Sequence, residues 1–422
     1  MAIKYSIPRG THDLLPSKSY QWEYVESIFR SVVKNFGYQE ICTPIFEHAE
    51  IFERSSGEAT DIVQKEMYRF TDRKGRNFAL RPEGTAPVVR SYIENNLGAD
   101  HQITKLFYVG QMFRYDRPQA GRTRQFSQYG TECIGSNHPY YDAENIAVFY
   151  TFLQRLGLKE FTVEINSIGC SNCSTIYNQI LQDYFEPYLD SMCPDCKNRW
   201  EKNPKRLLDC KIAKCQAITQ KSPSMLDYLD ESCYHHFVKV QEYLQMLAVP
   251  FRINSRIVRG LDYYSLTAFE FTNNALGSQN ALGGGGRYNG LIAKMGGKNT
   301  PAVGFAGGFS RLILSLENEK IPIGRPLIPQ YYLIASGIKT IPQAIGIVSF
   351  LRKHGVYVEF DPETKSLASH LKKADRQRAL FVLILGEDEL MNCELTIKNM
   401  TTGHQKAISL DSLEELLTYC PV

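Results

Sequence analysis

The chain has 422 residues, of which 43% are hydrophobic, 12% aromatic and 22% charged. This composition excludes collagen-like, coiled-coil and largely disordered proteins, and the length predicts two to four domains. The 48 Lys and Arg residues against 45 Asp and Glu leave a net charge of +3. A nucleic-acid partner would therefore have to be bound by a local basic patch.

The N-terminal residues 1–16 mix charge, Pro and Gly and lack the apolar stretch of a signal peptide. No apolar run approaches the ~18 residues that a membrane-spanning helix needs. Six of the 11 cysteines fall between Cys170 and Cys215, a pattern that favours reduced thiols or bound metal over a disulfide framework. We expect a cytoplasmic protein that does not contact a membrane.

The first half of the chain predicts an α+β domain. Apolar residues at helical spacing predict an amphipathic helix over 17–36, capped by Ser17 and ended by Gly37. Residues 39–52 are predicted to be extended, as an edge or bent strand because they contain Pro44. Further β-rich runs, separated by helical stretches, predict a mainly antiparallel sheet with helices. These runs are 78–80, 104–109, 128–134, 161–166 and 267–272.

The remaining chain predicts an insertion, a linker and a second domain. Residues 168–250 are rich in Cys and charge and carry helical patterns such as 222–248, so they are interpreted as a helical insertion. Three prolines in 317–330 indicate a linker. The predicted domains are 1–325 and 326–422, the second a small α/β domain. Its strands are predicted at 331–336, 356–360, 380–385, 394–398 and 405–409, and its helices at 340–354, 366–375 and from 411 onward.

Two polar motifs have the chemistry of a binding site. In RPEGTA (81–86), Arg81, Glu83 and Thr85 would share one side of an extended strand end, and a carboxylate beside a hydroxyl suits an ammonium group. In FRYDRPQAGRTRQF (113–126), four arginines within 11 residues would lie on two strands and a loop that clamp phosphates, with Phe126 available to stack on a base. The alternatives are an exposed polar loop and a solvated basic hairpin.

Three further motifs combine glycine with arginine or tyrosine: VRGLDYYS (258–265), ALGGGGRYNGL (281–291) and VGFAGGFSRLIL (303–314). Consecutive glycines let a backbone approach a ligand closely, but the second motif is neither a Walker loop nor a dinucleotide fingerprint. Each of the three alone is compatible with a structural role. Together with the arginine-rich hairpin, they suit ATP held on an antiparallel sheet and attacked at its α-phosphate.

The cysteine cluster predicts a separate metal site. Cys170 and Cys173 are joined to Cys193 and Cys196 by 19 residues, a spacing typical of structural zinc sites. Cys210 and Cys215 are further possible ligands. The alternative is that these residues only pack in a helical insertion.

Taken together, the motifs resemble those of the histidyl-tRNA synthetase family, a branch of the class II aminoacyl-tRNA synthetases. The resemblance runs from about residue 5 to about residue 415, and VRGLDYY and GGGRY are its most specific segments. It implies a class II antiparallel catalytic core and a C-terminal anticodon-binding domain. The implied reaction joins histidine to AMP, using ATP and Mg²⁺, and then transfers histidine to the 3′ end of tRNA(His).

The resemblance also implies roles for individual residues. Arg259 and Arg114 would be catalytic, stabilising charge at the α-phosphate. L-histidine would be bound by Glu83, Thr85, Arg114, Gln128, Glu132, Tyr263 and Tyr264. ATP would be bound by Arg114, Asp116, Arg122, Phe126, Arg259 and Arg311, with Phe126 stacked on adenine. Arg117 and Gln119 would contact the tRNA acceptor end, and Pro44 would lie in a homodimer interface.

Three positions depart from the family pattern, with Asp116 and Ser310 standing where Glu is usual and Asn289 where Asp is usual. None of them removes a group assigned to the chemistry. Two alternative functions remain open at this stage. One is a non-catalytic regulatory subunit of ATP phosphoribosyltransferase, and the other is a tRNA- or histidine-sensing module without turnover.

Overall fold

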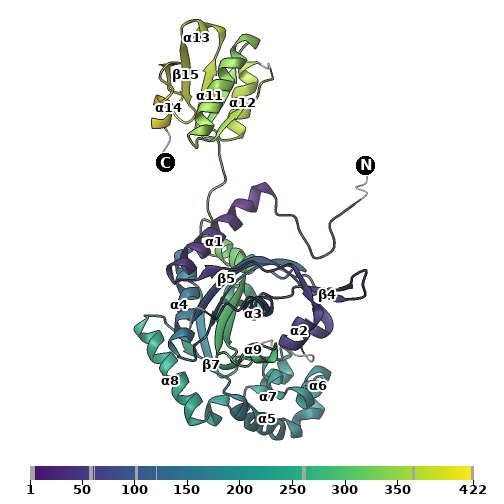
Figure 1. Cartoon of the computed structure of the whole chain (residues 1–422). Coiled ribbons are helices and arrows are strands. Elements are labelled where there is room, and N and C mark those ends of the chain that lie inside the picture. Colours follow the sequence, from purple (N-terminus) through teal and green to yellow (C-terminus); the bar gives the residue numbers. More distant parts are fainter. Residues whose placement is uncertain are drawn as a thin grey trace. The chain divides into compact units, whose positions relative to one another are not determined.

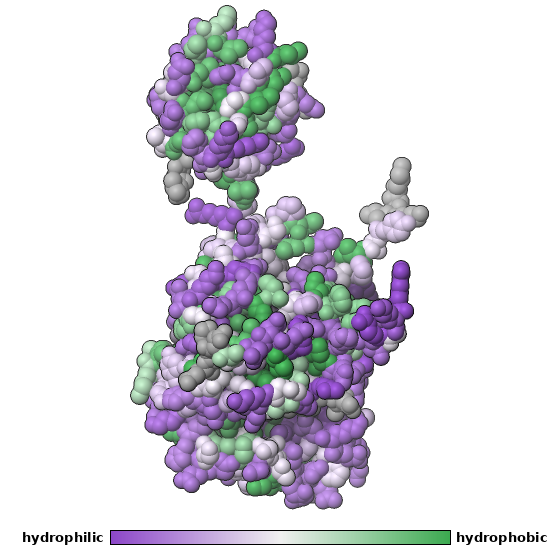
Figure 2. Space-filling view, in the orientation of Figure 1, coloured by the Kyte–Doolittle hydropathy of each residue, from purple (hydrophilic) through white to green (hydrophobic). Residues whose placement is uncertain are grey.

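A computed structural model of the chain describes residues 5–56, 60, 62–99, 103–119, 121–258, 263–363 and 366–419. The chain divides into two compact units, Met1–Arg325 and Pro326–Val422 (Figure 1). Hydrophilic residues cover most of the visible surface of the first unit, with small hydrophobic patches between them (Figure 2). Within the described ranges, no helix has both the length and the apolar character needed to cross a bilayer.

A large sheet forms the centre of the first unit, in the strand order β1-β5-β6-β11-β10-β9-β7-β8. Its edge pairs β1/β5 and β7/β8 are parallel and its other pairs are antiparallel, which confirms the predicted fold class. Its strands are β1 (Gln39–Glu40), β5 (Thr104–Phe113), β6 (Gln125–Ile134), β7 (Thr162–Ser167), β8 (Arg252–Ile253), β9 (Ser265–Thr272), β10 (Ala281–Arg287) and β11 (Ala302–Gly308).

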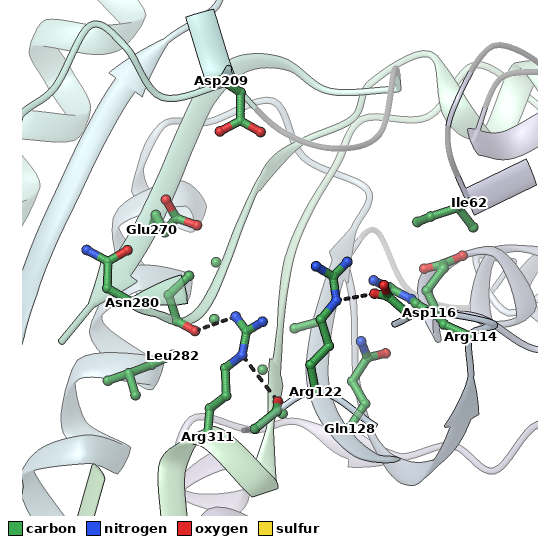
Figure 3. A pocket seen from close by; sticks show the side chains of 18 of the residues that line it. Ile62, Arg114, Asp116, Arg122, Gln128, Asp209, Glu270, Asn280, Leu282 and Arg311 are labelled. Carbon is green, nitrogen blue, oxygen red and sulfur yellow. Dashed lines mark hydrogen bonds and ion pairs between the residues drawn. The ribbon is translucent and has the colours of Figure 1, made fainter. Parts of the chain in front are cut away.

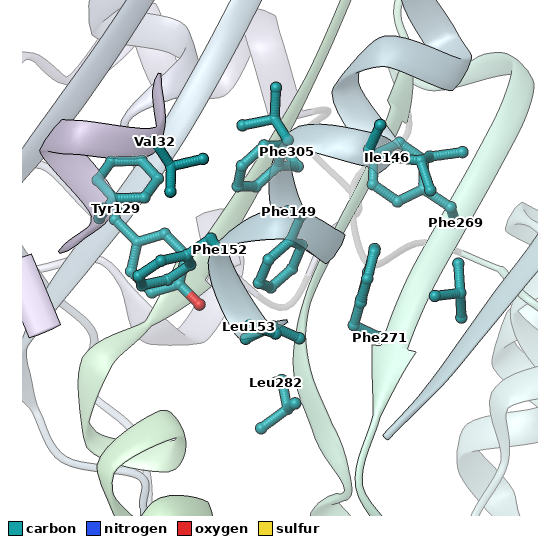
Figure 4. Packing of buried hydrophobic residues seen from close by; sticks show 14 of the residues in the cluster. Val32, Tyr129, Ile146, Phe149, Phe152, Leu153, Phe269, Phe271, Leu282 and Phe305 are labelled. Atoms are coloured by element: carbon teal, nitrogen blue, oxygen red, sulfur yellow. The ribbon is translucent and has the colours of Figure 1, made fainter. Parts of the chain in front are cut away.

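Four helices pack on this sheet and enclose the main hydrophobic core. Phe149 lies at its centre, with its ring stacked on that of Phe305 at 4.8 Å and tilted against that of Phe271 at 4.2 Å (Figure 4). These contacts join the helix that carries Phe149 to strands β11 and β9, so they hold this helix against one face of the sheet. The four helices are α1 (Pro16–Asn35), α4 (Tyr140–Arg155), α8 (Glu231–Met246) and α10 (Phe309–Asn318).

The first predicted helix is confirmed, but the extended segment that follows is partly wrong. Helix α1 begins at Pro16, the first-turn position that proline favours, and Ser17 does not cap it. Gly37 follows its end with a φ of +80°, which glycine adopts without strain. Residues 49–52 belong to helix α2 (Ala49–Ser56), where Ala49 and Phe52 share a buried face.

A three-stranded sheet in the order β2-β4-β3 is formed by strands that lie between β1 and β5 in the sequence. It positions the RPEGTA motif, because β4 ends one residue before Arg81 and helix α3 begins at Thr85. The elements of this region are β2 (Phe46–His48), a π-helical turn η1 (Ile62–Glu66), β3 (Arg69–Thr71), β4 (Asn77–Leu80), α3 (Thr85–Glu94) and, later in the chain, α9 (Leu291–Lys294).

The segment between β7 and β8 is helical, as the insertion was predicted to be. The predicted helical stretch 222–248 is broken into a short turn, η4 (Met225–Tyr228), and helix α8, because the side chain of Asp230 caps α8 by accepting from the amide of Cys233. The insertion's other elements are α5 (Ser171–Phe185), η2 (Glu186–Ser191), α6 (Pro194–Lys202), η3 (Pro204–Asp209) and α7 (Ala213–Thr219).

The second unit alternates strands and helices, as predicted. Its sheet has the order β13-β12-β14-β15-β16, in which the β13/β12 and β12/β14 pairs are parallel and the β14/β15 and β15/β16 pairs are antiparallel. The strands are β12 (Tyr331–Ala335), β13 (Val358–Phe360), β14 (Phe381–Leu385), β15 (Glu394–Asn399) and β16 (Gln405–Ser409). The helices are α11 (Ile341–Lys353), α12 (Leu367–Arg376), α13 (Glu387–Met391) and α14 (Glu415–Thr418), of which α13 was not predicted.

Candidate active site

A pocket of about 670 Å³ lies over the large sheet, a volume typical of small-molecule sites. Its floor is formed by glycine-rich stretches of β10 and β11, including Gly283, Gly284 and Gly307. Side chains from the β5–β6 loop, β6, β9 and α10 surround this floor, and Asp209 of the helical insertion points into the pocket from the opposite side (Figure 3). The pocket therefore brings together segments far apart in the sequence.

Glycine is required at several positions of β10 and β11 because neighbouring strands and side chains approach too closely for a Cβ. A Cβ on Gly285 would lie 2.0 Å from the carbonyl oxygen of Gly304, and one on Gly304 would lie 1.9 Å from Oε2 of Glu132. On Gly307, a Cβ would lie 2.4 Å from the hydroxyl of Tyr129. These glycines therefore let β10 and β11 pack closely against each other and against the side chains of β6.

At one end of the pocket, Glu132 is buried among hydroxyl groups. Thr85 donates its hydroxyl to Oε1 at 2.7 Å, and Tyr288 donates to Oε2 at 2.5 Å. Glu132 as a whole is 1% exposed and lies behind Thr85, which itself lines the pocket. Burial raises the pKa of Glu132 to about 8, although the two hydroxyl donors act in the opposite direction.

Two neighbouring side chains are fixed by the start of helix α3. Glu83 accepts from the amides of Thr85 and Ala86, at 2.7 and 2.8 Å, and so caps the helix. Gln128 accepts from the amide of Gly84 at 3.1 Å. Burial raises the pKa of Glu83, partly offset by these amide donors. Together these groups offer carboxylate and amide oxygens to a ligand with N–H donors.

The other end of the pocket is strongly cationic. Arg114 donates to the carbonyl oxygen of Pro82 at 2.8 Å, and its guanidinium lies 5.5 Å from the ring centroid of Phe126. Arg311 donates to the carbonyl oxygen of Ala281 at 3.0 Å (Figure 3). Burial lowers the pKa of Arg311, and so do the nearby positive charges of Arg122 and Arg114. An anion bound between these guanidiniums would relieve that repulsion.

The loop between β5 and β6 is held by a second group of polar contacts. Asp116 forms an ion pair with Arg122, whose Nη2 also lies 3.7 Å from a carboxylate oxygen of Glu66. Gln119 and Arg122 exchange two backbone hydrogen bonds of 3.1 and 2.9 Å. Arg117 and Gln119 are exposed on this loop and do not line the pocket.

Comparison with known proteins identifies the family. A sequence model of histidyl-tRNA synthetase matches residues 10–181 and 209–312, which is more than half of the chain. The chain belongs to the histidyl-tRNA synthetase family. An anticodon-binding-domain model matches residues 330–418, within the second compact unit.

Relatives in the histidyl-tRNA synthetase family extend over nearly the whole chain. The histidine–tRNA ligase of Pelotomaculum thermopropionicum is 48% identical over 410 residues, covering 97% of this chain and 96% of that protein. The one from Protochlamydia amoebophila is 43% identical over 422 residues, covering 98% and 100%. The crystal structure of apo S. aureus histidyl-tRNA synthetase superposes with a TM-score of 0.83 at 37% identity, covering 98% and 99%.

A Bacillus halodurans structure described as an ATP phosphoribosyltransferase regulatory subunit/histidyl-tRNA synthetase is also similar in fold. Its TM-score is 0.67 at 20% identity, and the match covers 92% of this chain and 99% of that one. At that identity the likeness shows a shared fold alone. The regulatory-subunit alternative therefore has weaker support than membership in the synthetase family.

The structure of this family member brings most of the predicted site residues together. The pocket is lined by Glu83, Thr85, Arg114, Asp116, Arg122, Phe126, Gln128, Tyr263, Tyr264 and Arg311. Glu132 lies directly behind this layer, bonded to Thr85. The predicted catalytic residue Arg259 lies outside the described residues, between the pocket-lining residues Val258 and Tyr263 in the sequence.

The prediction that Arg81, Glu83 and Thr85 face one side of a strand end is wrong. The strand has already ended at Leu80, and Thr85 begins a helix. Arg81 is directed to the main chain, donating to the carbonyl oxygens of Gln111 at 2.9 Å and Thr43 at 2.8 Å. It holds neighbouring segments in place, whereas the other two line the pocket.

The predicted four-cysteine metal set is also wrong as a single group. Cys193 and Cys196 cluster with Cys210 and Cys215, which had been considered only as further possible ligands. Cys170 and Cys173 belong to a second cluster, with Asp230 and Cys233. Spacing along the chain paired two cysteine motifs that the fold places in different clusters.

Several residues of the site were not found from the sequence. Tyr108 and Tyr288 enclose Glu132 and Gln128, and only the alternation of side chains along β5 hints at the first of them. A buried ion pair between Arg287 and Asp142, both fully buried, ties the end of β10 to the start of α4. The insertion contributes pocket residues that no motif had indicated, namely Asp195, Arg199, Asp209, Lys211 and Ile212.

Proposed function

We propose that this chain is a histidine–tRNA ligase, which activates histidine with ATP to histidyl-adenylate and pyrophosphate and then transfers histidine to the 3′ end of tRNA(His). The observation that carries this proposal is the pocket's division into two ends in a member of this family. One end holds a buried acid among hydroxyls, and the other holds three guanidiniums beside an aromatic ring. The acidic end suits an imidazole and an amino group, and the cationic end suits a nucleoside triphosphate.

Histidine would bind at the acidic end. Glu83, Thr85 and Gln128 would receive its amino group, because their oxygens line the pocket at the start of α3. Glu132, Tyr263 and Tyr264 would bind its imidazole ring. A carboxyl group that pairs with a ring N–H discriminates against side chains lacking that donor, by up to ~10⁴–10⁵ in favourable sites.

ATP would lie across the glycine floor. Phe126 would stack on the adenine, Arg114 would hold the α-phosphate, and Arg311 would hold the γ-phosphate. Asp116 and Arg122 would complete this end, and their ion pair would open as the nucleotide binds. In the activation step, a carboxylate oxygen of histidine bonds to the α-phosphorus while the bond to the pyrophosphate oxygen breaks. Fixed cations lower the barrier by stabilising the charge that builds up on the phosphate.

Mg²⁺ would accompany the ATP. The carboxylate of Glu270 lines the pocket close to Asn280 (Figure 3), and Mg²⁺ typically binds through one or two carboxylates together with substrate phosphates. This donor fits the ion. When bound, Mg²⁺ would neutralise charge on the phosphates.

Arg259 would supply the second catalytic cation. We expect Arg259→Ala to keep histidine binding but to slow adenylate formation by two orders of magnitude or more, because one fixed charge at a developing oxyanion is typically worth ~10²–10³ in rate. Histidine affinity by calorimetry and pyrophosphate exchange would be measured on the same preparation. Unchanged exchange would remove Arg259 from the reaction.

The tRNA would contact both units. Arg117 and Gln119 are exposed on the β5–β6 loop, where they would meet the acceptor end, and the second unit would bind the anticodon. We also propose a homodimer with Pro44 in its interface, and a cytoplasmic location. Sedimentation at increasing protein concentration would test the dimer.

ATP–pyrophosphate exchange tests the proposed function directly. Exchange with histidine, and not with the other 19 amino acids, is the expected result, followed by histidine transfer to tRNA(His). Histidine binding without any exchange would contradict the proposal and favour the regulatory-subunit alternative.

A further inference from the structure

The helical insertion contains two compact groups of metal-binding side chains that take no part in the proposed reaction. We infer that each group binds one Zn²⁺ ion, so that the chain carries two structural zinc ions in separate sites. The inner site consists of Cys193, Cys196, Cys210 and Cys215, and the outer site consists of Cys170, Cys173, Asp230 and Cys233.

The inner site is built from four thiols on short helical elements. Within each site, all ligand atoms lie within 4.8 Å of one another, and Sγ of Cys193 lies 3.9 Å from Sγ of Cys210. Backbone amides already point at two of the sulfurs. Cys196 donates to Sγ of Cys193 and Cys193 donates to Sγ of Cys215, each at 3.4 Å. Such outer donors orient metal ligands and stabilise their charge.

The outer site joins the start of α5 to the start of α8. Sγ of Cys173 lies 3.6 Å from that of Cys170 and 3.8 Å from that of Cys233. Asp230 places Oδ2 3.1 and 3.2 Å from the sulfurs of Cys170 and Cys173, while its Oδ1 caps α8. Its own amide donates to Sγ of Cys173 at 3.2 Å. One carboxylate and three sulfurs thus converge on one point.

The sulfur spacing matches a tetrahedral zinc ion. A tetrahedron with zinc–sulfur bonds of ~2.3 Å has edges of about 3.8 Å. Three of the sulfur pairs are 3.6, 3.8 and 3.9 Å apart, whereas a disulfide would hold its sulfurs about 2.05 Å apart. Seven of the eight residues in the two sites are cysteines, and the eighth is Asp230. Soft thiolates select zinc over harder cations such as Mg²⁺.

The insertion also needs such support, because its core is small. Of the 13 buried residues in its hydrophobic cluster, five are cysteines of these two sites: Cys173, Cys196, Cys210, Cys215 and Cys233. Small cores are commonly stabilised by a structural metal or by disulfides, and none of the cysteines in the described residues is in a disulfide.

The two sites are nested in the sequence, since both inner pairs fall between Cys173 and Asp230. The outer ion would close the insertion at its base, and the inner ion would fix its tip. Cys193 and Cys210 also line the active-site pocket, beside Asp195 and Asp209. The inner ion would therefore hold the side of the pocket that faces the sheet.

Elemental analysis of the purified full-length protein tests the proposal. Two zinc ions per chain are expected, falling to one in Cys210→Ser and to one in Cys233→Ser. The matched controls are Cys42→Ser and Cys393→Ser, which change exposed cysteines outside both sites and should leave two ions. One ion, no ion, or iron in place of zinc in the unmutated protein would overturn the proposal.

Cobalt substitution tests the ligand sets without relying on variants that fail to fold. Protein reconstituted with Co²⁺ should show thiolate-to-metal charge transfer from two tetrahedral sites. Asp230→Cys should keep two ions and shift the spectrum of one of them toward that of an all-thiolate site. A spectrum unchanged by this substitution would overturn the assignment of Asp230 as a ligand.

Discussion

Among the described residues, Glu132 is surrounded by hydroxyl donors and tyrosine side chains. Thr85 and Tyr288 each donate to one of its oxygens, and burial raises its pKa to about 8. At neutral pH the acid is therefore mainly protonated before a ligand arrives. An imidazole could therefore form hydrogen bonds with an uncharged acid, and binding would not require a buried carboxylate charge.

The raised pKa of Glu132 gives a stability prediction. An acid whose pKa is raised on folding stabilises the protein fully only below its unfolded pKa of ~4.3, and this contribution is lost as the pH rises to about 8. Glu132→Gln mimics the protonated acid, so its stability relative to the unmutated protein should increase over that range. Thermal unfolding at several pH values measures the difference.

The control for that experiment is Glu23→Gln, at an exposed position of α1. Its stability difference from the unmutated protein should be small and independent of pH. If Glu132→Gln behaved in the same way, Glu132 would be ionised in the folded protein at neutral pH.

Gly304 is a second residue whose role follows from its surroundings. An added Cβ would lie 1.9 Å from Oε2 of Glu132 and 2.4 Å from the carbonyl oxygen of Thr131, so the backbone of β6 would have to move. We expect Gly304→Ala to cost ~1–3 kcal/mol of unfolding free energy and to weaken histidine binding. Gly290→Ala, where nothing lies within 4 Å of the added Cβ, introduces no clash, so its cost should be limited to the loss of a favoured N-cap residue, about 1 kcal/mol or less, and histidine binding should not change. Denaturant unfolding and calorimetry would compare them.

At the scale of elements, strand and helix periods predicted much of the fold, but several boundaries depended on contacts. The antiparallel sheet and α1 could be predicted because each carries a regular apolar pattern. The start of α3 could not, because Glu83 caps it only once the chain has turned at the end of β4. The helix at 49–56 was hidden by its proximity to Pro44, and its apolar residues were interpreted as part of a strand.

The site could be predicted in its residue types but not in its partners. Glu132 meets Tyr288 across 156 residues of sequence, and no local pattern links them. The cysteines show the same limit. The outer cluster uses Asp230 in a position where spacing rules look for a second cysteine pair, so the sequence suggested the wrong set.

The ion pair between Arg287 and Asp142 joins β10 to α4, and its contribution to the free energy of unfolding can be measured. Arg287 Nε lies 3.1 Å from both carboxylate oxygens, and both residues are fully buried. Burial alone would raise the pKa of Asp142, but the Arg287 charge and His236 lower it to about 2. The contribution of this carboxylate to stability is thus present above its unfolded pKa of ~3.9 and is lost only as the pH falls through about 2.

We expect Asp142→Asn to destabilise the first unit by ~3–5 kcal/mol at neutral pH, because it leaves the Arg287 charge buried without its partner. Denaturant unfolding measures the loss. The matched control is Glu242→Gln, which removes one partner of the exposed Lys239–Glu242 pair and should cost far less than Asp142→Asn, because water screens this pair. Equal effects of the two variants would mean that the buried pair does not join β10 to α4 energetically.

At the scale of the whole molecule, the proposed steps are divided between two compact units. The pocket and its arginines belong to Met1–Arg325, and the anticodon-binding match lies in Pro326–Val422. A change confined to the second unit should therefore affect tRNA recognition without affecting the activation of histidine. Helix α12 offers the means to test this, because Lys372 and Arg376 are exposed on it, whereas Lys373 is paired with Asp361 at 2.7 Å.

We expect the double variant Lys372→Ala/Arg376→Ala to raise the KM for tRNA(His) and to leave histidine-dependent pyrophosphate exchange unchanged. If both side chains contact phosphates, the slope of log affinity against log salt should become shallower by about two. Each phosphate contact that is lost means that about one counterion fewer is released when the tRNA binds. Lys353→Ala, an exposed lysine of α11, is the matched control for a general loss of positive charge. Filter binding of tRNA over a salt series compares the variants. An unchanged slope in the double variant would mean that this face of α12 is simply solvated, and a loss of exchange would mean that the two units are not independent in function.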